Sequence, residues 1–142
     1  MRWIYHDGGR TDAGYTGEAD DCVCRAIAIA AEVEYSVVYA AINAHARSER
    51  PRAGRSRSSA RTGVAIQTWR RYLADLGWTW HPTMHIGAGC TVHLRADELP
   101  HGRLIVQVSK HVVAMIDGVI FDTHDPSRDG TRCVYGYYTQ AR

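Results

Sequence analysis

Apolar positions follow a helical spacing in the first half of the chain and a strand-like alternation in the second half. This pattern predicts three helices, over residues 22–31, 37–47 and about 63–76. The first is rich in alanine and isoleucine, as expected for a helix that is buried on most sides. The expected N-caps are Asp20 or Asp21 for the first helix, Ser36 for the second and Thr62 for the third, and Gly77 is the expected C-cap of the third.

The second half of the chain predicts an antiparallel sheet. Asp117-Gly118 separates two apolar runs and is a strong signal for a two-residue β-hairpin. Residues 97–100 resemble a single helical turn. The expected strands are 3–5, 78–80, 104–108, 111–116, 119–123 and 132–138. Helices followed by strands indicate an α+β fold, and the length of 142 residues suits a single domain over residues 1–142.

Composition narrows the function classes only slightly. Hydrophobic residues make up 45% and charged residues 23%, values that are ordinary for a globular protein. The net charge of +2 is too small to indicate nucleic-acid binding by itself. No apolar run approaches the roughly 20 residues that span a bilayer, and the N-terminus has no apolar signal-peptide core. We therefore predict a cytoplasmic protein without a membrane partner, whose cysteines at 22, 24, 90 and 133 stay reduced.

The positive charge is concentrated in one segment. Residues 48–61 combine arginine, serine, glycine and proline and are predicted to form a mobile loop. This loop has three interpretations: a solvated connector, a lid or recognition segment, or a phosphate-binding surface. Aromatic residues that would stack on bases are absent from it, which weakens the nucleic-acid interpretation. The candidate recognition residues are Arg52, Arg55, Arg57 and Arg61.

A cysteine nucleophile is the strongest chemical hypothesis. Cys22 stands at the predicted start of a helix, where the helix terminus lowers a thiol pKa. If Asp117-Gly118 is the hairpin turn, His111 and Asp122 lie on one face of the paired strands, as diagonal neighbours. Histidine would then activate the thiol and the acid would orient the imidazole. Asp125 is the alternative acid, if the strand turns inward near Pro126.

The competing interpretation is structural, because free cysteine is among the residue types most often buried. Cys24 lies deeper in the same helix and is read as a core residue. Cys133 alternates within the last predicted strand and is also expected to be buried, whereas Cys90 follows a glycine-rich turn.

The order of these motifs resembles the papain-like cysteine peptidase superfamily. Asp21-Cys22, His111 and Asp125-Pro126 are similar to the nucleophile, histidine and acid motifs of its C39-like branch, the bacteriocin-processing peptidases. The resemblance implies a helical half that carries the cysteine, packed on an antiparallel sheet. It departs at the oxyanion position, where this chain has Thr16 instead of glutamine.

A second likeness concerns the C-terminal part of the chain. The stretch from residues 93–100 to residues 134–137 resembles small uncharacterised proteins of bacteria and their phages, and this likeness implies no activity.

These observations predict a hydrolase or acyl transferase that acts on an amide, peptide, isopeptide or thioester bond through Cys22. The expected partner is a peptide or protein substrate, and the oligomeric state is open. One alternative is a catalytically silent papain-like module that binds a protein or peptide. The other is a nucleic-acid-associated protein that uses the arginine-rich loop.

No cofactor and no metal are predicted. A zinc site built on Cys22 and Cys24 with Cys90, His93 or Cys133 is disfavoured, because Cys-x-Cys on a helix does not aim both sulfurs at one ion.

Overall fold

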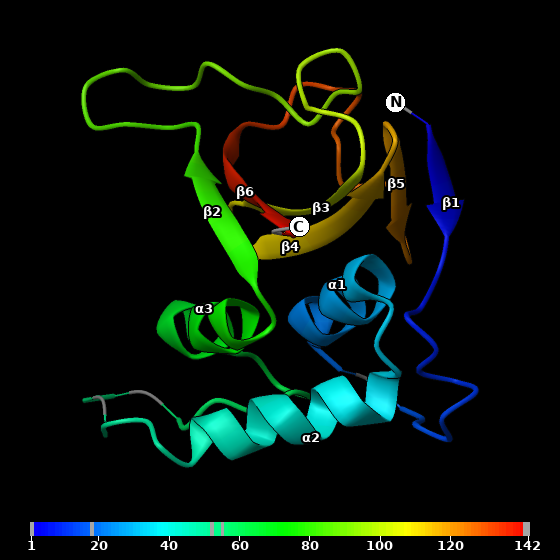
Figure 1. The fold of residues 1–142 in the computed structure, drawn as a ribbon, viewed down its shortest axis with the longest axis vertical. Coiled ribbons are helices and arrows are strands. Elements are labelled where there is room, and N and C mark those ends of the chain that lie inside the picture. Colours follow the sequence, from blue (N-terminus) through cyan, green and yellow to red (C-terminus); the bar gives the residue numbers. More distant parts are fainter. Residues whose placement is uncertain (1, 18, 52, 55, 141–142) are drawn as a thin grey trace.

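The computed structural model describes residues 2–17, 19–51, 53–54 and 56–140. Within these residues the chain forms three helices and a six-stranded mixed sheet, which confirms the α+β class. Figure 1 shows the helices on one side of the sheet, with α1 and α3 next to it and α2 farther out. The elements are β1 (Trp3–Tyr5), α1 (Cys22–Ala31), α2 (Tyr35–Ala46), α3 (Ile66–Asp75), β2 (Trp78–Pro82), β3 (Arg103–Val108), β4 (His111–Ile116), β5 (Val119–Asp122) and β6 (Val134–Gln140).

The strands follow the order β1-β5-β4-β3-β6-β2. Neighbouring strands are antiparallel except at one edge, where β1 pairs with β5 in parallel. The antiparallel sheet predicted for the second half of the chain is therefore confirmed for β2 to β6, and β1 adds a parallel strand at one edge. A parallel pair needs a long crossover connection, and here all the elements between β1 and β5 provide it.

The β4–β5 hairpin follows the predicted register. Ala114 pairs with Phe121, and Ile116 pairs with Val119 directly before the turn. Asp117 and Gly118 both have positive φ, at 48° and 81°, as a type I′ turn requires. This short turn brings the start of β4 close to the end of β5.

Both faces of the sheet are covered. Ile105 and Ala114 pack against the helices in one core, whereas Leu104 and Met115 belong to a second core on the other face. Leu94 and Leu99, from the segment between β2 and β3, complete the second core. Because side chains alternate along a strand and both faces are buried, β3 and β4 are almost continuously apolar.

The predicted helix caps are the least accurate part of the secondary structure. The residues at the N-cap positions of α1, α2 and α3 are Asp21, Glu34 and Ala65, and none of them makes a side-chain cap hydrogen bond. Ser36 is already inside α2. Residues 96–98 form a turn instead of a helix. None of the helices is long and apolar enough to cross a membrane, in the part of the chain that is described.

The cysteines also differ from expectation. Cys90 and Cys133 form a disulfide, with their Cα atoms 5.7 Å apart, so the prediction that they remain reduced is wrong in this structure. They are brought together by an isolated β-bridge between His93 and Cys133, a contact between distant segments that spacing does not reveal. Cys22 and Cys24 are free.

Candidate active site

Cys22 is the first residue of α1, with its side chain partly exposed. The N–H groups in the first turn of a helix have no acceptor within the helix, and the helix dipole adds partial positive charge there. A thiolate at this position is therefore stabilised electrostatically. The backbone N–H of Val112 on β4 also helps to lower the pKa of the Cys22 thiol.

His111 and Asp122 are the terminal residues of β4 and β5, and they meet at the end of the hairpin. The His111 Nε2 atom lies 2.6 Å from Asp122 Oδ2, and the two side chains are only 11% and 4% exposed. Asp122 Oδ1 accepts a hydrogen bond of 2.7 Å from the backbone N–H of Thr123. With Nε2 engaged by Asp122, Nδ1 is the ring nitrogen that remains for another group, and the charge and hydrogen bonding of His111 act on the nearby Cys22 thiol.

The pKa shifts of Cys22 and His111 are in the directions that favour an ion pair. Burial would raise the pKa of the Cys22 thiol, but the hydrogen bond and charge of His111 lower it below its ordinary value of 9.0. Burial would lower the pKa of His111, but its hydrogen bonds to Asp122 and Cys22 raise it to about 9. For Asp122, the hydrogen bond from His111 outweighs burial and lowers the pKa of the carboxyl. These directions favour a thiolate, an imidazolium and a carboxylate.

The two candidate acids have different surroundings. Asp122 contacts His111, whereas the Oδ1 atom of Asp125 accepts a hydrogen bond of 2.9 Å from the backbone N–H of Ser127. Asp125 thus stabilises the turn after β5. The geometry predicted from the hairpin matches this arrangement better than the acid position implied by the family resemblance.

A buried charge network supports the site from α1. Asp21 is 2% exposed, and its carboxylate contacts Arg25, the Tyr35 hydroxyl at 2.6 Å and Arg10 at 3.5 Å. Arg25 also reaches Asp122 Oδ1 at 3.4 Å. The Asp21 carboxylate is therefore paired with cations, as its position beside a cysteine thiolate would require. Arg25 links the start of α1 to Asp122 at the end of β5.

The Cys22 side chain opens into a cavity of about 770 Å³. Its walls come from α1, from α3 and the segment that leads into it, from the end of β3, the start of β4 and β6, and from the residues after β5. The lining residues are Ala19, Asp20, Asp21, Cys22, Val23, Arg25, Thr62, Gly63, Val64, Ile66, Trp69, Gln107, Val108, Lys110, His111, Val112, Thr123, His124 and Tyr135. A cavity of this size accommodates a small molecule or several residues of a peptide.

Gln107 was not predicted as a site residue. It is 8% exposed, lines the same cavity as Cys22 and pairs in register with Val112. Its Oε1 atom is buried without a hydrogen-bond partner. Buried polar groups are normally paired, so an unpaired acceptor in the wall of this cavity points to a donor group on a ligand. The sequence signal was a single polar residue inside the apolar strand 104–108.

Thr16, the predicted oxyanion residue, is exposed and does not line this cavity. Its carbonyl oxygen accepts hydrogen bonds from Arg10 and Arg61 instead. The loop before α1 therefore uses Thr16 to hold two arginines, and its assignment as an oxyanion donor is wrong.

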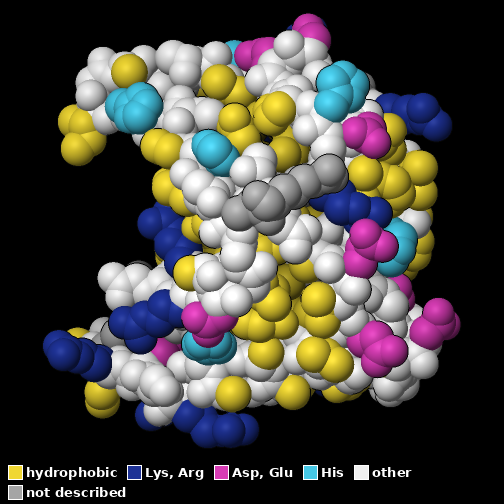
Figure 2. Space-filling view, in the orientation of Figure 1, with side chains coloured by type: hydrophobic (Ala, Val, Ile, Leu, Met, Phe, Trp, Pro, Cys, Tyr) yellow, Lys and Arg dark blue, Asp and Glu magenta, His cyan; other side chains and the backbone are white. Residues whose placement is uncertain are grey.

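The arginine-rich segment is partly fixed. Arg57 donates to the carbonyl oxygen of Ala46, at 2.8 Å, and Ser59 pairs with Gly63 in an isolated bridge. Residues 57–61 are thus tied to the end of α2 and to the turn before α3, in contrast to the predicted mobile loop. Arg52 and Arg55 lie outside the described residues. In Figure 2, Lys and Arg side chains gather near the end of α2, at the lower left.

Two other groups near Cys22 have different roles. Cys24 is fully buried, and burial raises the pKa of its thiol to about 12, so it is unsuited to nucleophilic attack. His124 is exposed, and its ring lies 5.2 Å from that of His111. One potential ligand atom from each of His111, Asp122 and His124 falls within 4.8 Å of the others, a spacing that metal ligands also show.

Protein-family models, curated proteins and solved structures were compared with the chain, and none of them matches it. Its function is therefore inferred from the geometry of the site.

Proposed function

We propose that the protein is a papain-like cysteine hydrolase or acyl transferase, in which Cys22 attacks the carbonyl carbon of an amide, isopeptide or thioester. The observation that carries this proposal is the buried His111–Asp122 pair next to Cys22 in the wall of an open cavity, with a His111 pKa that is raised and a Cys22 pKa that is lowered. A cysteine that only packs in the core does not require a charged histidine beside it. In Cys24, two residues away, the pKa of the thiol is raised instead of lowered.

The reaction follows from these contacts. The Cys22 thiolate adds to the carbonyl carbon and forms a tetrahedral intermediate with a negatively charged oxygen. The imidazolium of His111 gives its proton to the leaving group, and a thioester remains on Cys22. His111, now neutral, takes a proton from water or from an acceptor amine, which attacks the thioester and regenerates the thiolate. Asp122 keeps the imidazole oriented throughout, since it accepts the Nε2 proton.

The oxyanion needs donors other than Thr16. The backbone N–H of Cys22 is available at the start of α1, and we assign the second donor to the carboxamide Nε2 of Gln107. The Oε1 atom of the same carboxamide, buried without a partner, is left to accept a hydrogen bond from an N–H group of the substrate.

The substrate is proposed to be a peptide or protein. The cavity combines apolar walls from Val23, Ile66 and Trp69 with polar groups at Asp20 and Lys110. Such a mixture suits an extended peptide that carries both apolar and polar side chains.

The test is acylation with p-nitrophenyl acetate. The wild type is expected to release p-nitrophenol in a burst of one equivalent and to gain an acetyl group on Cys22, detected by peptide mass spectrometry. Cys22→Ala should lose both signals, whereas Cys24→Ala should retain them. Labelling that persists in Cys22→Ala, or that falls on another residue, would refute the proposal.

A further inference from the structure

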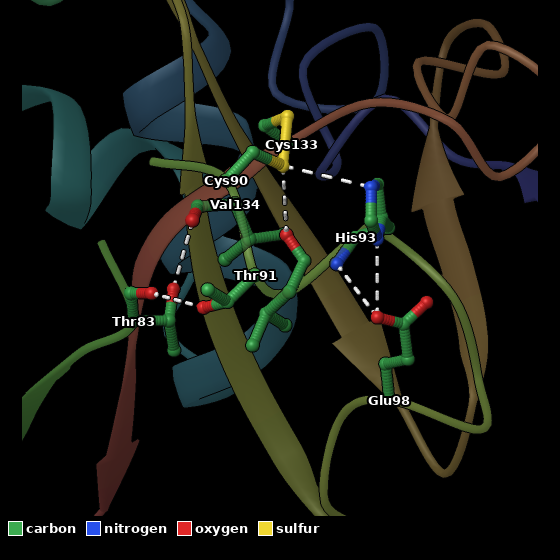
Figure 3. Close-up of a disulfide and its surroundings, with 8 residues drawn as sticks. Thr83, Cys90, Thr91, His93, Glu98, Cys133 and Val134 are labelled. Atoms are coloured by element: carbon green, nitrogen blue, oxygen red, sulfur yellow. Dashed lines mark hydrogen bonds and ion pairs between the residues drawn. A yellow bond between two sulfur atoms is a disulfide. The ribbon is translucent and has the colours of Figure 1, made fainter. Parts of the chain in front are cut away.

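A second cluster of reactive side chains lies away from the cavity, on the segment between β2 and β3. Cys90 and His93 belong to this segment, and Cys133 directly precedes β6. Each of the three offers one potential ligand atom, and these atoms lie within 4.8 Å of one another. Figure 3 shows the histidine side chain directed toward the two sulfur atoms. The chemistry of this set, two thiols and one imidazole, is that of zinc sites in proteins.

The imidazole is oriented for a ligand. His93 Nδ1 lies 3.1 Å from Glu98 Oε1, and the backbone N–H of His93 donates to the same oxygen at 3.2 Å. A carboxylate accepts the Nδ1 proton, so Nε2 carries the free lone pair. Nε2 lies 3.5 Å from the Cys90 sulfur. Zinc-bound histidines usually donate the N–H of their other ring nitrogen to a carboxylate, and Glu98 is placed to accept such a bond from His93.

The distances fit a tetrahedral ion. Zinc–sulfur bonds of about 2.3 Å and zinc–nitrogen bonds of about 2.0–2.1 Å place sulfur and nitrogen about 3.5 Å apart on a tetrahedron. This separation equals the distance between Cys90 Sγ and His93 Nε2. The Cα atoms of Cys90 and Cys133 are 5.7 Å apart, so both side chains can reach one ion after the disulfide is reduced.

We propose that the reduced form of Cys90 and Cys133 binds Zn²⁺ together with His93, with Glu98 as the residue that positions the imidazole. A dithiol reductant supplies two electrons and two protons, becomes a disulfide itself and leaves two thiols on the protein. Zinc then displaces both thiol protons and binds the thiolates, and a water molecule or an external ligand completes the tetrahedron. The disulfide and the zinc site exclude each other.

Each state joins the same two segments. The disulfide or the ion links the segment that carries Leu94 and Leu99, which covers the second core, to the start of β6. In a reducing compartment such as the cytoplasm, where disulfides are rare, zinc would replace the covalent link. The sequence-based objection to zinc concerned Cys22 and Cys24, neither of which belongs to this cluster.

The experiment uses Co²⁺ as the probe, because thiolate ligands give it a charge-transfer band in the near ultraviolet. The background variant is Cys22→Ser, so that the accessible thiols are those of Cys90 and Cys133. After reduction by a phosphine and removal of the reductant, the protein should bind one Co²⁺ with this band, and Zn²⁺ should displace it. The oxidised protein should show no band.

Further variants identify the ligands. His93→Ala or Cys90→Ser should weaken Co²⁺ binding by at least about tenfold, and Glu98→Gln by about 10- to 100-fold. Asp97→Asn, a change to the neighbouring exposed acid, should leave it unchanged. Circular dichroism checks the fold of each variant.

The proposal is overturned if the folded, reduced protein shows no charge-transfer band. It is equally overturned if His93→Ala binds Co²⁺ as tightly as the background protein, or if the reduced protein is unfolded and Co²⁺ does not restore it. Because Cys22 is absent from the background, none of these outcomes depends on the proposed enzymatic function.

Discussion

Arg25 joins α1 to the hairpin, and its replacement by methionine tests the buried charge network. Methionine keeps most of the length and the apolar stem of arginine but removes its charge. The change leaves Asp21 and Asp122, whose side chains are 2% and 4% exposed, without their shared cation. Both carboxylates then remain in a site from which water is largely excluded.

Removing one partner from a buried ion pair typically destabilises a protein by about 3–5 kcal/mol. Asp21 keeps Arg10 and the Tyr35 hydroxyl, and Asp122 keeps His111, so the lower end of this range applies. For 142 residues the entropy of unfolding is about 0.3 kcal/mol per kelvin. We therefore expect Arg25→Met to lower the free energy of unfolding by about 3 kcal/mol and Tm by about 10 °C.

Urea denaturation and thermal unfolding, both followed by circular dichroism, measure this loss. The matched control is Arg95→Met, because Arg95 forms exposed ion pairs with Asp97 and Glu98 and its replacement should produce no measurable change. Adding Asp21→Asn to Arg25→Met should restore part of the stability, since it removes one unpaired charge. A loss below about 1 kcal/mol for Arg25→Met would refute the reasoning about buried charge.

Three further predictions concern single residues. The imidazole of His111 should titrate near pH 9 instead of 6.5, since its hydrogen bonds favour the protonated form, and an NMR titration that gives 6.5 would contradict this. Gln107→Leu should slow acylation by p-nitrophenyl acetate about 10²-fold. Cys22 should still react with iodoacetamide at an unchanged rate, because alkylation forms no oxyanion. An equal loss of rate in both reactions would argue against an oxyanion role for Gln107. Gly136→Ala should destabilise the protein by about 1–3 kcal/mol in urea denaturation, because its Cβ would lie 2.3 Å from the Trp80 ring and 2.8 Å from the His81 carbonyl oxygen. Trp80→Leu in the same chain should relieve only the part of that loss that comes from the ring.

Local features of the fold were predictable from the sequence. The β4–β5 hairpin followed from Asp117-Gly118 and the alternation around it, because turn type and register are decided by neighbouring residues. The juxtaposition of His111 and Asp122 is a direct consequence of that register. The start of α1 at Cys22 and Asp21 at its N-cap position were also correct, although the Asp21 carboxylate bonds Arg25 and Tyr35 instead of the helix amides.

Contacts between distant segments were not predictable in the same way. The parallel pairing of β1 with β5 and the meeting of Cys90 with Cys133 depend on how the whole chain packs. Gln107 resembled an ordinary strand residue until the position of α1 placed a thiol and a cavity beside it. The assignment of Thr16 depended on the family resemblance alone, and the loop that carries it has a different role in this chain.

The most direct measurement is the rate of alkylation of Cys22 as a function of pH, with limiting iodoacetamide and peptide mass spectrometry, in the wild type and in His111→Ala. Cys24 is the internal control, because burial raises the pKa of its thiol to about 12. Cys22 should react fast below pH 7 in the folded wild type. In His111→Ala this advantage should disappear and the inflection should move toward or above 9, since burial then raises the thiol pKa unopposed by the imidazolium. Cys22 that reacts no faster than Cys24, or that keeps its low-pH reactivity without His111, would contradict a thiolate–imidazolium nucleophile.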